Sequence, residues 1–300
     1  MRWRDSVLAA LLGMLLATVP ADAADPDKVR LVHRQLSVYR NIQVMDRGSE
    51  RCMIFGRRNS RQTCIDLQRP GVLIQPYSHA MLAGLLVTPK PRRALVIGLG
   101  GGVIPMALRQ LDPAMQIDAV ELDPAVISVA QRHFGYRQDA SSKAHADDGR
   151  MFVRRQLRAG RRYDMVLVDA YDENYIPEHL LTREFLLQLR ELLDPGGVVV
   201  ANTFADRPLQ RFEDATYQSV FGATWSLYSS SRGNHIILAA RDGTPSSGSL
   251  QANARLLDGR LERFGTPADA LLHALQQDPR VIGVKPLTDQ YSPANLLLQY

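Results

Sequence analysis

The chain has 300 residues, of which 45% are hydrophobic and 22% are charged, which is the composition of a globular protein able to bury a core. Its formal net charge is +5 at pH 7, but the basic residues are spread along the chain without aromatic interleaving or a dense block. This pattern indicates a solvated surface and argues against a nucleic-acid partner.

Residues 1–23 differ from the rest of the chain. Two arginines precede the apolar run 7–19, which ends at a proline and the small-residue sequence Ala-Asp-Ala. The run is shorter than the roughly 20 residues that span a bilayer, so we expect a signal peptide. The mature protein is then exported, periplasmic or extracellular, with no stable membrane span after cleavage. The alternative is an uncleaved N-terminal anchor.

Residues 24–75 are expected to form a small N-terminal β domain. The segments 51–55 and 62–66 have the pattern of a hairpin, which places Cys52 opposite Cys64. In an oxidising compartment these two cysteines are expected to form a disulfide, with two unpaired thiols as the alternative. We expect no metal site, because no Cys or His pair has ligand spacing.

The segment 94–103 has the pattern of a nucleoside-binding turn. The apolar run 94–97 is typical of a buried parallel strand, and glycines separate it from the expected helix 104–111. Such a turn directs backbone N–H groups at a ligand, and its glycines are Gly98, Gly100, Gly101 and Gly102. Glu121 ends the next expected strand, 117–121, where a carboxylate can hold both ribose hydroxyls. The spacing is not GxGxxG, so an S-adenosylmethionine-type cofactor is expected in place of NAD. A tight loop without a ligand is the alternative.

Strands and helices alternate through residues 76–241. This alternation predicts a doubly wound, Rossmann-like parallel sheet of the class I methyltransferase type. Further expected elements are helices 124–133, 150–159 and 182–192, strands 164–168 and 198–203, a polar loop at 135–145, and a closing antiparallel pair at 225–228 and 235–240. A polar linker, 242–249, leads to a helical C-terminal extension, 250–300, with helices expected at 252–264 and 267–277. Ligands bind at the carboxyl ends of such strands, where Asp148 and Asp169 are also expected.

From Ser37 to Ala240, the order of these parts resembles the spermidine synthase (polyamine aminopropyltransferase) family. The sequence Asp169-Ala-Tyr-Asp172, followed by Pro177, Leu180 and Phe185, is similar to the catalytic loop of that family. The glycine turn stands at its cofactor loop. The resemblance implies transfer of an aminopropyl group from decarboxylated S-adenosylmethionine to a di- or polyamine such as putrescine, without a metal. By analogy it also implies a homodimer.

The resemblance implies that Asp169 takes the proton of the attacking amine. A primary alkylamine resembles lysine, with a pKa near about 10.4, so at neutral pH it is mostly protonated and needs a base. The residues implied to bind the amine are Asp172, His79 and Tyr77. Those implied to bind the cofactor, besides the glycines, are Glu121 at the ribose, Asp148 at the adenine amino group, and Gln62. The alternatives are a turn and helix-cap pair for the two aspartates of the catalytic loop, and a helix-surface position for the histidine.

Three departures from the family pattern concern the substrates. Gly101 stands where the family has an aspartate that helps hold the donor's amino group. Ser78-His79-Ala80-Met81 lacks the glutamate of the corresponding family segment, and a serine replaces the tyrosine that precedes Gly233. The alternative functions are therefore an S-adenosylmethionine methyltransferase and a non-catalytic polyamine- or nucleoside-binding protein. In the tail, Asp289 and Tyr291 would either cover the cleft or cap the domain.

Overall fold

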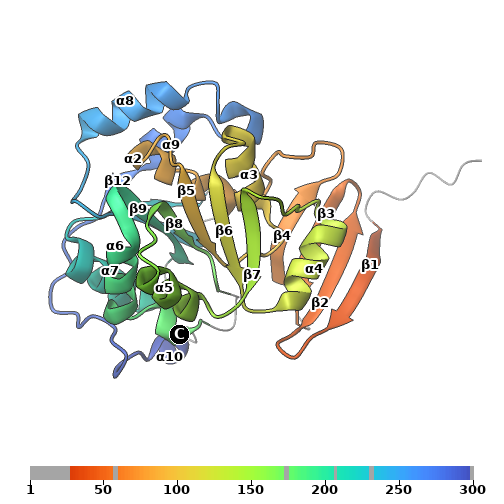
Figure 1. The fold of residues 1–300 in the computed structure, drawn as a ribbon, viewed down its shortest axis with the longest axis horizontal. Helices are drawn as coiled ribbons and strands as arrows, with labels where there is room; N and C mark the ends of the chain where they lie inside the picture. Colours follow the sequence, from red (N-terminus) through yellow and green to blue (C-terminus); the bar gives the residue numbers. More distant parts are fainter. Residues whose placement is uncertain (1–27, 57–59, 172–175, 206–207, 230–232, 298–300) are drawn as a thin grey trace, which may run out of the picture.

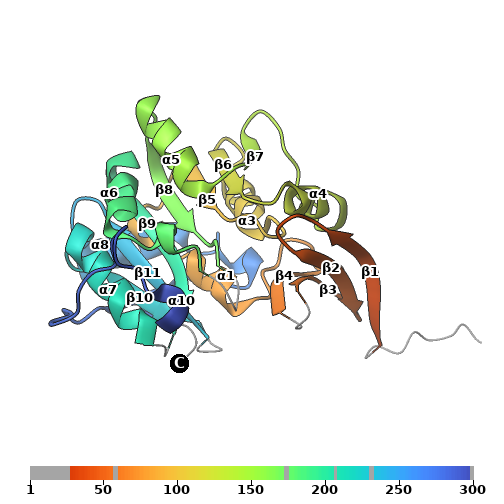
Figure 2. The same ribbon diagram turned by 90° about the horizontal axis from the view of Figure 1, so that it is seen from below.

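A computed structural model describes residues 28–56, 60–171, 176–205, 208–229 and 233–297. Within these residues the chain forms two sheets, one of four strands and one of eight. The four-stranded sheet stands at one side of the molecule, beside α4 (Pro124–His133), as Figures 1 and 2 show. The mixed α/β fold class predicted from the sequence is confirmed.

The smaller sheet is an antiparallel meander in the order β1-β2-β3-β4. Its strands are β1 (Val29–Leu36), β2 (Asn41–Arg47), β3 (Glu50–Phe55) and β4 (Ser60–Asp66). Ile42 and Val44 alternate along β2 and are buried against the apolar face of α4, which attaches the sheet to the rest of the molecule. Cys52 and Cys64 lie directly opposite each other and form a disulfide with an S–S distance of 2.06 Å, which confirms the predicted pairing.

The larger sheet has the strand order β12-β10-β11-β9-β8-β5-β6-β7. Its parallel strands are β5 (Arg93–Ile97), β6 (Gln116–Glu121), β7 (Ser142–Ala146), β8 (Tyr163–Val168) and β9 (Leu193–Phe204). Antiparallel pairing adds β10 (Trp225–Tyr228), β11 (Asn234–Ala240) and β12 (Gln276–Gln277). β5 pairs with β6 on one side and with β8 on the other, so the strand order reverses at β5. Doubly wound sheets bind their ligands at this switch point.

Helices cover both faces of the larger sheet (Figure 1). One layer holds α1 (Pro76–Met81), α2 (Gly84–Val87), α3 (Val103–Leu111), α8 (Ser247–Leu257) and α9 (Ala268–Ala274). The other holds α5 (Gly149–Arg158), α6 (Arg183–Leu192) and α7 (Pro208–Phe221). Along β5, Val96 packs into the first layer and Leu95 and Ile97 into the second. Both faces of the strand are therefore buried, which explains why its sequence is continuously apolar.

Several predicted boundaries are corrected. The expected polar loop 135–145 contains most of β7, an edge strand that pairs with β6, and edge strands carry a weaker apolar pattern. Helix α7 was not expected from the sequence. Helix α8 begins inside the expected linker because the Ser246 side chain caps it by accepting the N–H of Ser249.

The C-terminal extension also departs from expectation. The expected helix 267–277 ends at Ala274, and Gln276–Gln277 continue as β12. The extension packs against the main domain, since Leu250, Leu257 and Leu271 belong to the same core cluster as β5. Short 3-10 turns, η1 (Glu178–Leu180) and η2 (Glu262–Phe264), and α10 (Ala294–Leu297) complete the elements. In the described part of the chain, no helix has the length and apolar character needed to cross a membrane.

Candidate active site

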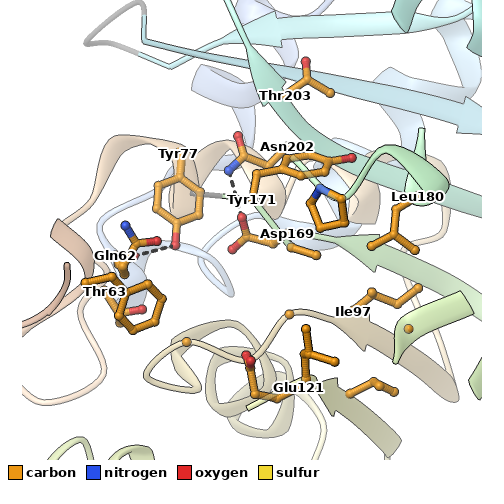
Figure 3. A pocket seen from close by; sticks show the side chains of 18 of the residues that line it. Gln62, Thr63, Tyr77, Ile97, Glu121, Asp169, Tyr171, Leu180, Asn202 and Thr203 are labelled. Atoms are coloured by element: carbon orange, nitrogen blue, oxygen red, sulfur yellow. Dashed lines mark hydrogen bonds between the residues drawn. The ribbon is translucent and has the colours of Figure 1, made fainter. Parts of the chain in front are cut away.

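A cavity of about 410 Å³ opens at the carboxyl ends of β5, β6, β8 and β9. Its volume is within the range of small-molecule sites. Residues of β4 and α1 form another part of its wall, so the cavity lies between the two sheets. Of the residues predicted for the site, it is lined by Gln62, Tyr77, Gly98, Gly100, Glu121, Asp148 and Asp169. Figure 3 shows the side chains of Asp169, Tyr77 and Asn202 grouped together, with Glu121 farther along the cavity.

Gly98 lets the turn after β5 pass directly beside the end of β8. Its φ angle is +93°, and a Cβ atom there would lie 2.0 Å from the carbonyl oxygen of Asp169. A side chain is therefore excluded by both conformation and space. Gly100, with φ +51°, also lines the cavity. The nucleoside turn and the predicted catalytic carboxylate are thus neighbours because of a glycine.

Gly101 and Gly102 are the other two glycines of the turn. The Gly101 N–H donates to Thr63 Oγ1 at 2.9 Å, and the Gly102 N–H donates to the Leu99 carbonyl oxygen at 2.9 Å. A Cβ atom would lie 2.6 Å from Thr63 Cγ2 at the first position and 2.6 Å from the Tyr136 ring at the second. Both glycines pack closely and neither belongs to the described cavity lining, so their contact with a cofactor stays a prediction.

Glu121 lies at the end of β6 and faces the cavity. Its Oε2 accepts the N–H of Leu99 and its Oε1 that of Asp123, both at 3.1 Å. Burial raises the pKa of Glu121, and the hydrogen bonds from the backbone of Asp123 and Leu99 lower it in part. The backbone therefore fixes the orientation of a carboxylate that can accept two further hydrogen bonds from vicinal hydroxyls.

Asp148 precedes α5 and caps it. Its Oδ1 accepts the N–H of Met151 at 2.9 Å, and its Oδ2 lies 2.8 Å from Nε2 of His179. Asp148 is thus the N-cap residue of α5, and its carboxylate lies in the cavity wall at the same time. The predicted contact with an adenine amino group stays a prediction. His179, which also lines the cavity, was not expected from the sequence, because it lies in a short 3-10 turn without a motif of its own.

Asp169 directly follows β8 and is partly buried at the cavity. Its Oδ1 accepts a hydrogen bond from Nδ2 of Asn202 at 2.8 Å. Burial raises the pKa of Asp169, while hydrogen bonds from Asn202 and from the Tyr77 hydroxyl lower it. The result is a carboxylate of increased basicity, held by neutral donors and facing a cavity. This is the arrangement that a general base needs.

Tyr77, on α1, lies on the cavity wall and is held there by a hydrogen bond to β4. Its hydroxyl donates to the backbone carbonyl oxygen of Gln62 at 3.3 Å and is also within hydrogen-bonding reach of Asp169. Burial raises the pKa of Tyr77 well above its ordinary value, and the nearby Asp169 charge raises it further. The phenol therefore stays neutral and has one proton, which it can give to either acceptor. Both Tyr77 and Gln62 lie where the sequence predicted them.

His79 does not line the cavity, which contradicts its expected contact with the amine. Successive residues of a helix are rotated by about 100° about its axis, so the side chains of residues two positions apart point to nearly opposite sides. Because Tyr77 faces the cavity, His79 faces away, and its Nδ1 contacts Thr266 Oγ1 of the C-terminal extension. Burial lowers the pKa of His79. The structure supports a packing role.

Asp172, Asp289 and Tyr291 were also named from the sequence. Asp172 lies outside the described residues. Asp289 forms a bidentate ion pair with Arg150, both N···O distances being 2.7 Å, and accepts from Thr182 Oγ1 at 2.7 Å. It attaches the tail to α5 and α6 and is absent from the described cavity wall, so the capping alternative is favoured. Tyr291, 49% exposed, likewise does not belong to the described lining.

A pair of asparagine side chains at the ends of β9 and β11 was not expected from the sequence. Asn202 and Asn234 both line the cavity, and Asn234 Nδ2 donates to Asn202 Oδ1 at 3.0 Å. Tyr171 also lines it, with a buried hydroxyl that has no hydrogen-bond partner among the described residues. These residues have ordinary strand-end and loop sequences. The sheet register brings the two asparagines to Asp169, whereas Tyr171 follows it in the same loop.

The fold and the site together define a Rossmann-like transferase with an S-adenosylmethionine-type cofactor. The spermine/spermidine synthase domain, as a family model, matches residues 76–224. A polyamine aminopropyltransferase of Vibrio vulnificus (strain CMCP6) is 40% identical over 274 residues, which are 89% of this chain and 91% of the relative. The chain belongs to the spermine/spermidine synthase family. Its predicted family and its class as a transferase are therefore confirmed.

Solved structures agree on the fold. A probable spermidine synthase from Corynebacterium glutamicum ATCC 13032 has a TM-score of 0.67 at 19% identity, covering 86% of this chain and 96% of that one. Human methyltransferase-like protein 13, in complex with SAH, has a TM-score of 0.55 at 23% identity, covering 69% and 95%. The same fold thus occurs in a probable spermidine synthase and in a methyltransferase-like protein.

Proposed function

We propose that this protein is an aminopropyltransferase that moves the aminopropyl group of decarboxylated S-adenosylmethionine to a nitrogen of a di- or polyamine, with Asp169 as the general base. One observation carries the proposal: Asp169 shares a cavity with Glu121 and lies against the backbone of Gly98. A base for the amine and a clamp for the nucleoside would therefore face the same cavity.

The proposed reaction is a nucleophilic displacement at the propyl carbon that is bonded to the sulfonium. The amine nitrogen donates its lone pair to the propyl carbon bonded to the sulfonium, and a new C–N bond forms as the C–S bond breaks. The bonding pair returns to sulfur and leaves a neutral thioether nucleoside. The amine proton passes to Asp169, which is suited to it because burial raises the pKa of this carboxyl. Products are the extended amine, the thioether and a proton that later leaves to solvent.

The same cavity suggests how the two substrates are held. Glu121 would accept from the ribose hydroxyls, Asp148 from the adenine amino group, and Gly98 and Gly100 would allow the nucleoside to approach the backbone. Tyr77 and Gln62 lie on the opposite wall, next to Asp169. The amine would approach between this wall and the end of β8, with its nitrogen toward the carboxylate.

A methyltransferase is the second candidate, and one observation favours it. Thr63 packs against Gly101, so the glycine turn offers no acid to the amino group of the donor. Without that acid, intact S-adenosylmethionine is not rejected at this point.

The purified protein should be incubated with decarboxylated or intact S-adenosylmethionine and with putrescine, cadaverine or spermidine, and the products separated by mass spectrometry. The proposal expects amines extended by an aminopropyl group and an equal amount of methylthioadenosine, from the decarboxylated donor alone. Methylated amines and S-adenosylhomocysteine from the intact donor would establish the second candidate. Tight binding of an amine or nucleoside without any product would establish the non-catalytic alternative.

We also propose that the protein is exported after removal of residues 1–23. The Cys52–Cys64 disulfide supports this location, because disulfides persist in oxidising compartments and are rare in the cytoplasm. Mass spectrometry of the protein from separated cell fractions should find a mature N-terminus at Ala24 outside the cytoplasm. An intact N-terminus in the cytoplasmic fraction would refute the proposal.

A further inference from the structure

Two asparagines connect Asp169 to the antiparallel part of the larger sheet, where β9 pairs with β11. Asn202 lies near the end of β9, and Asn234 begins β11. The register pairs Asn202 with Ile236 and Asn234 with Phe204, so the two asparagines are diagonal neighbours on one face. Asn202 Nδ2 donates to Asp169 Oδ1 at 2.8 Å, and Asn234 Nδ2 donates to Asn202 Oδ1 at 3.0 Å.

We propose that Asn202 and Asn234 form an amide relay that positions Asp169 for proton transfer. Both are positioning residues that act through Asp169, and the inference rests on the proposed function.

The direction of the two hydrogen bonds supports the relay. A primary amide has an acceptor oxygen on one side and a donor NH₂ group on the other. Because Asn234 occupies the oxygen of Asn202, the NH₂ group of Asn202 must face Asp169. The reverse orientation would place two oxygens against each other. Asn234 thus fixes the orientation of an amide that it shares with the base.

The orientation of the Asn202 amide is important because the side chain is buried. Asn202 is 8% exposed, so a lost partner is poorly replaced by water. The backbone of Asn234 is itself fixed, since its N–H donates to Ser229 Oγ at 3.3 Å and its carbonyl oxygen accepts the Ser229 N–H at 2.9 Å. The hydrogen bond to Asp169 Oδ1 therefore comes from a side chain whose own position is fixed by the sheet. The second carboxylate oxygen of Asp169 is not engaged by the two asparagines and would be available to the amine.

The relay also sets the basicity of Asp169. The hydrogen bond from Asn202 lowers the pKa of this carboxyl against the opposing effect of burial. Removing the donor should therefore raise the pKa of Asp169, reduce the ionised fraction at neutral pH, and move the acid limb of the rate profile to higher pH. A residue with only a structural role would change stability without moving that limb.

The test compares pH–rate profiles of the wild type with those of Asn202→Leu, Asn202→Asp and Asn234→Leu. Asn202→Leu should move the acid limb of the amine transfer rate upward by about one pH unit, the scale of one hydrogen bond to a charged group. Asn202→Asp should move it farther, because two adjacent carboxylates oppose each other's ionisation. Asn234→Leu, which frees the Asn202 amide to rotate, should give a smaller shift in the same direction.

Asn253 offers a matched control. Its Nδ2 donates to the carbonyl oxygen of Leu86 at 2.8 Å, on α8 and outside the described cavity lining. Asn253→Leu removes a comparable amide bond and should lower stability while leaving the acid limb in place. An unmoved limb in both Asn202 variants, or an equal shift in the control, would overturn the relay.

A second measurement separates the relay from the proposed function. NMR of isotope-labelled aspartate follows the carboxyl titration of Asp169, identified by its loss in Asp169→Asn. The relay expects this titration to move to higher pH in Asn202→Leu or, if that variant does not fold, in the isosteric Asn202→Asp. If the wild type transfers nothing to an amine, the proposed function fails while this titration still decides the relay. An unchanged titration overturns the relay even when transfer is observed.

Discussion

Replacement of Asp169 by asparagine distinguishes a catalytic carboxylate from one that only binds a cation. The amide has almost the same shape, and its oxygen can take the place of Oδ1 and accept from Nδ2 of Asn202, now at 2.8 Å. The Tyr77 hydroxyl also keeps an acceptor in the Gln62 carbonyl oxygen. We therefore expect Asp169→Asn to fold and to bind the nucleoside with nearly unchanged affinity, since Glu121 and the glycine turn are not altered.

The rate should fall much more than the affinity. Loss of a general base typically costs about 10²–10⁴-fold in rate, which corresponds to about 3–5 kcal/mol in the barrier. At pH 7.4 only about one part in a thousand of an amine with pKa near 10.4 is neutral. Solvent supplies more neutral amine as the pH rises, so the difference between variant and wild type should shrink toward pH 10. In the wild type, activity should rise with pH as Asp169 loses its proton, above the ordinary carboxyl range because burial raises its pKa.

The assay measures formation of the extended amine by mass spectrometry from pH 6 to 10, with nucleoside binding followed by calorimetry. Asp118→Asn is the matched control: this carboxylate, on β6, accepts from the Tyr163 hydroxyl at 2.8 Å and lies outside the described cavity lining. The control should lose stability and keep transfer within about threefold, since its bonds are structural. Wild-type turnover in Asp169→Asn, or an equal loss in the control, would refute a base at this position.

Three further expectations concern binding and stability. Glu121→Gln should weaken nucleoside binding about tenfold in calorimetry, because the charge-assisted acceptors for the ribose hydroxyls are lost. The melting temperature should change by no more than a few degrees. An unchanged affinity would show that Glu121 does not contact the nucleoside. Joint replacement of Cys52 and Cys64 by serine should lower the free energy of unfolding in urea by about 2–3 kcal/mol, as expected for a short closed loop, and an unaltered midpoint would contradict it. Glu213 is 1% exposed, neither carboxylate oxygen has a hydrogen-bond partner among the described residues, and burial raises its pKa well above the ordinary value. The stability that the protonated Glu213 carboxyl contributes is fully present below its pKa in the unfolded chain, and it is lost as the pH rises through its higher pKa in the folded protein. Glu213→Gln should therefore become increasingly more stable than the wild type as the pH rises. A difference in unfolding free energy that stays constant when urea unfolding is repeated across this pH range would exclude the linkage.

The predicted residues that the structure brings together in one cavity are those positioned by local patterns. Gly98 and Glu121 each end or follow a short apolar strand, and the carboxyl ends of parallel strands meet at one edge whatever the rest of the chain does. Asp169 was found for the same reason. The disulfide followed from a hairpin whose strands place Cys52 and Cys64 in register. Local periodicity and strand polarity therefore suffice to place these residues at one edge of the sheet.

The features of the site that the sequence did not predict depend on the rotation of α1 about its axis and on the pairing register of β9 and β11. The family resemblance implied that His79 binds the amine, yet the phase of α1 directs Tyr77 into the cavity and His79 away from it. Asn202 and Asn234 are far apart in the chain, and their contact requires one particular antiparallel register between β9 and β11. A shift of one residue would send the two amides to opposite faces. No pattern within either strand contains that information.

The glycine turn shows how a departure from the family pattern is accommodated. A side chain at Gly101 would lie 2.6 Å from Thr63 Cγ2 and 3.0 Å from the Phe134 ring, and the hydroxyl of Thr63 already accepts the Gly101 N–H. Thr63 and Gly101 are therefore a matched pair, and an acid could not be restored at the turn without also shortening the threonine. The described carboxylates of the cavity wall are Glu121, Asp147, Asp148 and Asp169. Of these four, Asp169 is the carboxylate whose charge acts on Tyr77, while Glu121 and Asp148 accept backbone N–H groups elsewhere on the wall. Under the proposed function, the cationic amine would therefore be recognised by Asp169, as it is held by Asn202, and not by an acid in the glycine turn.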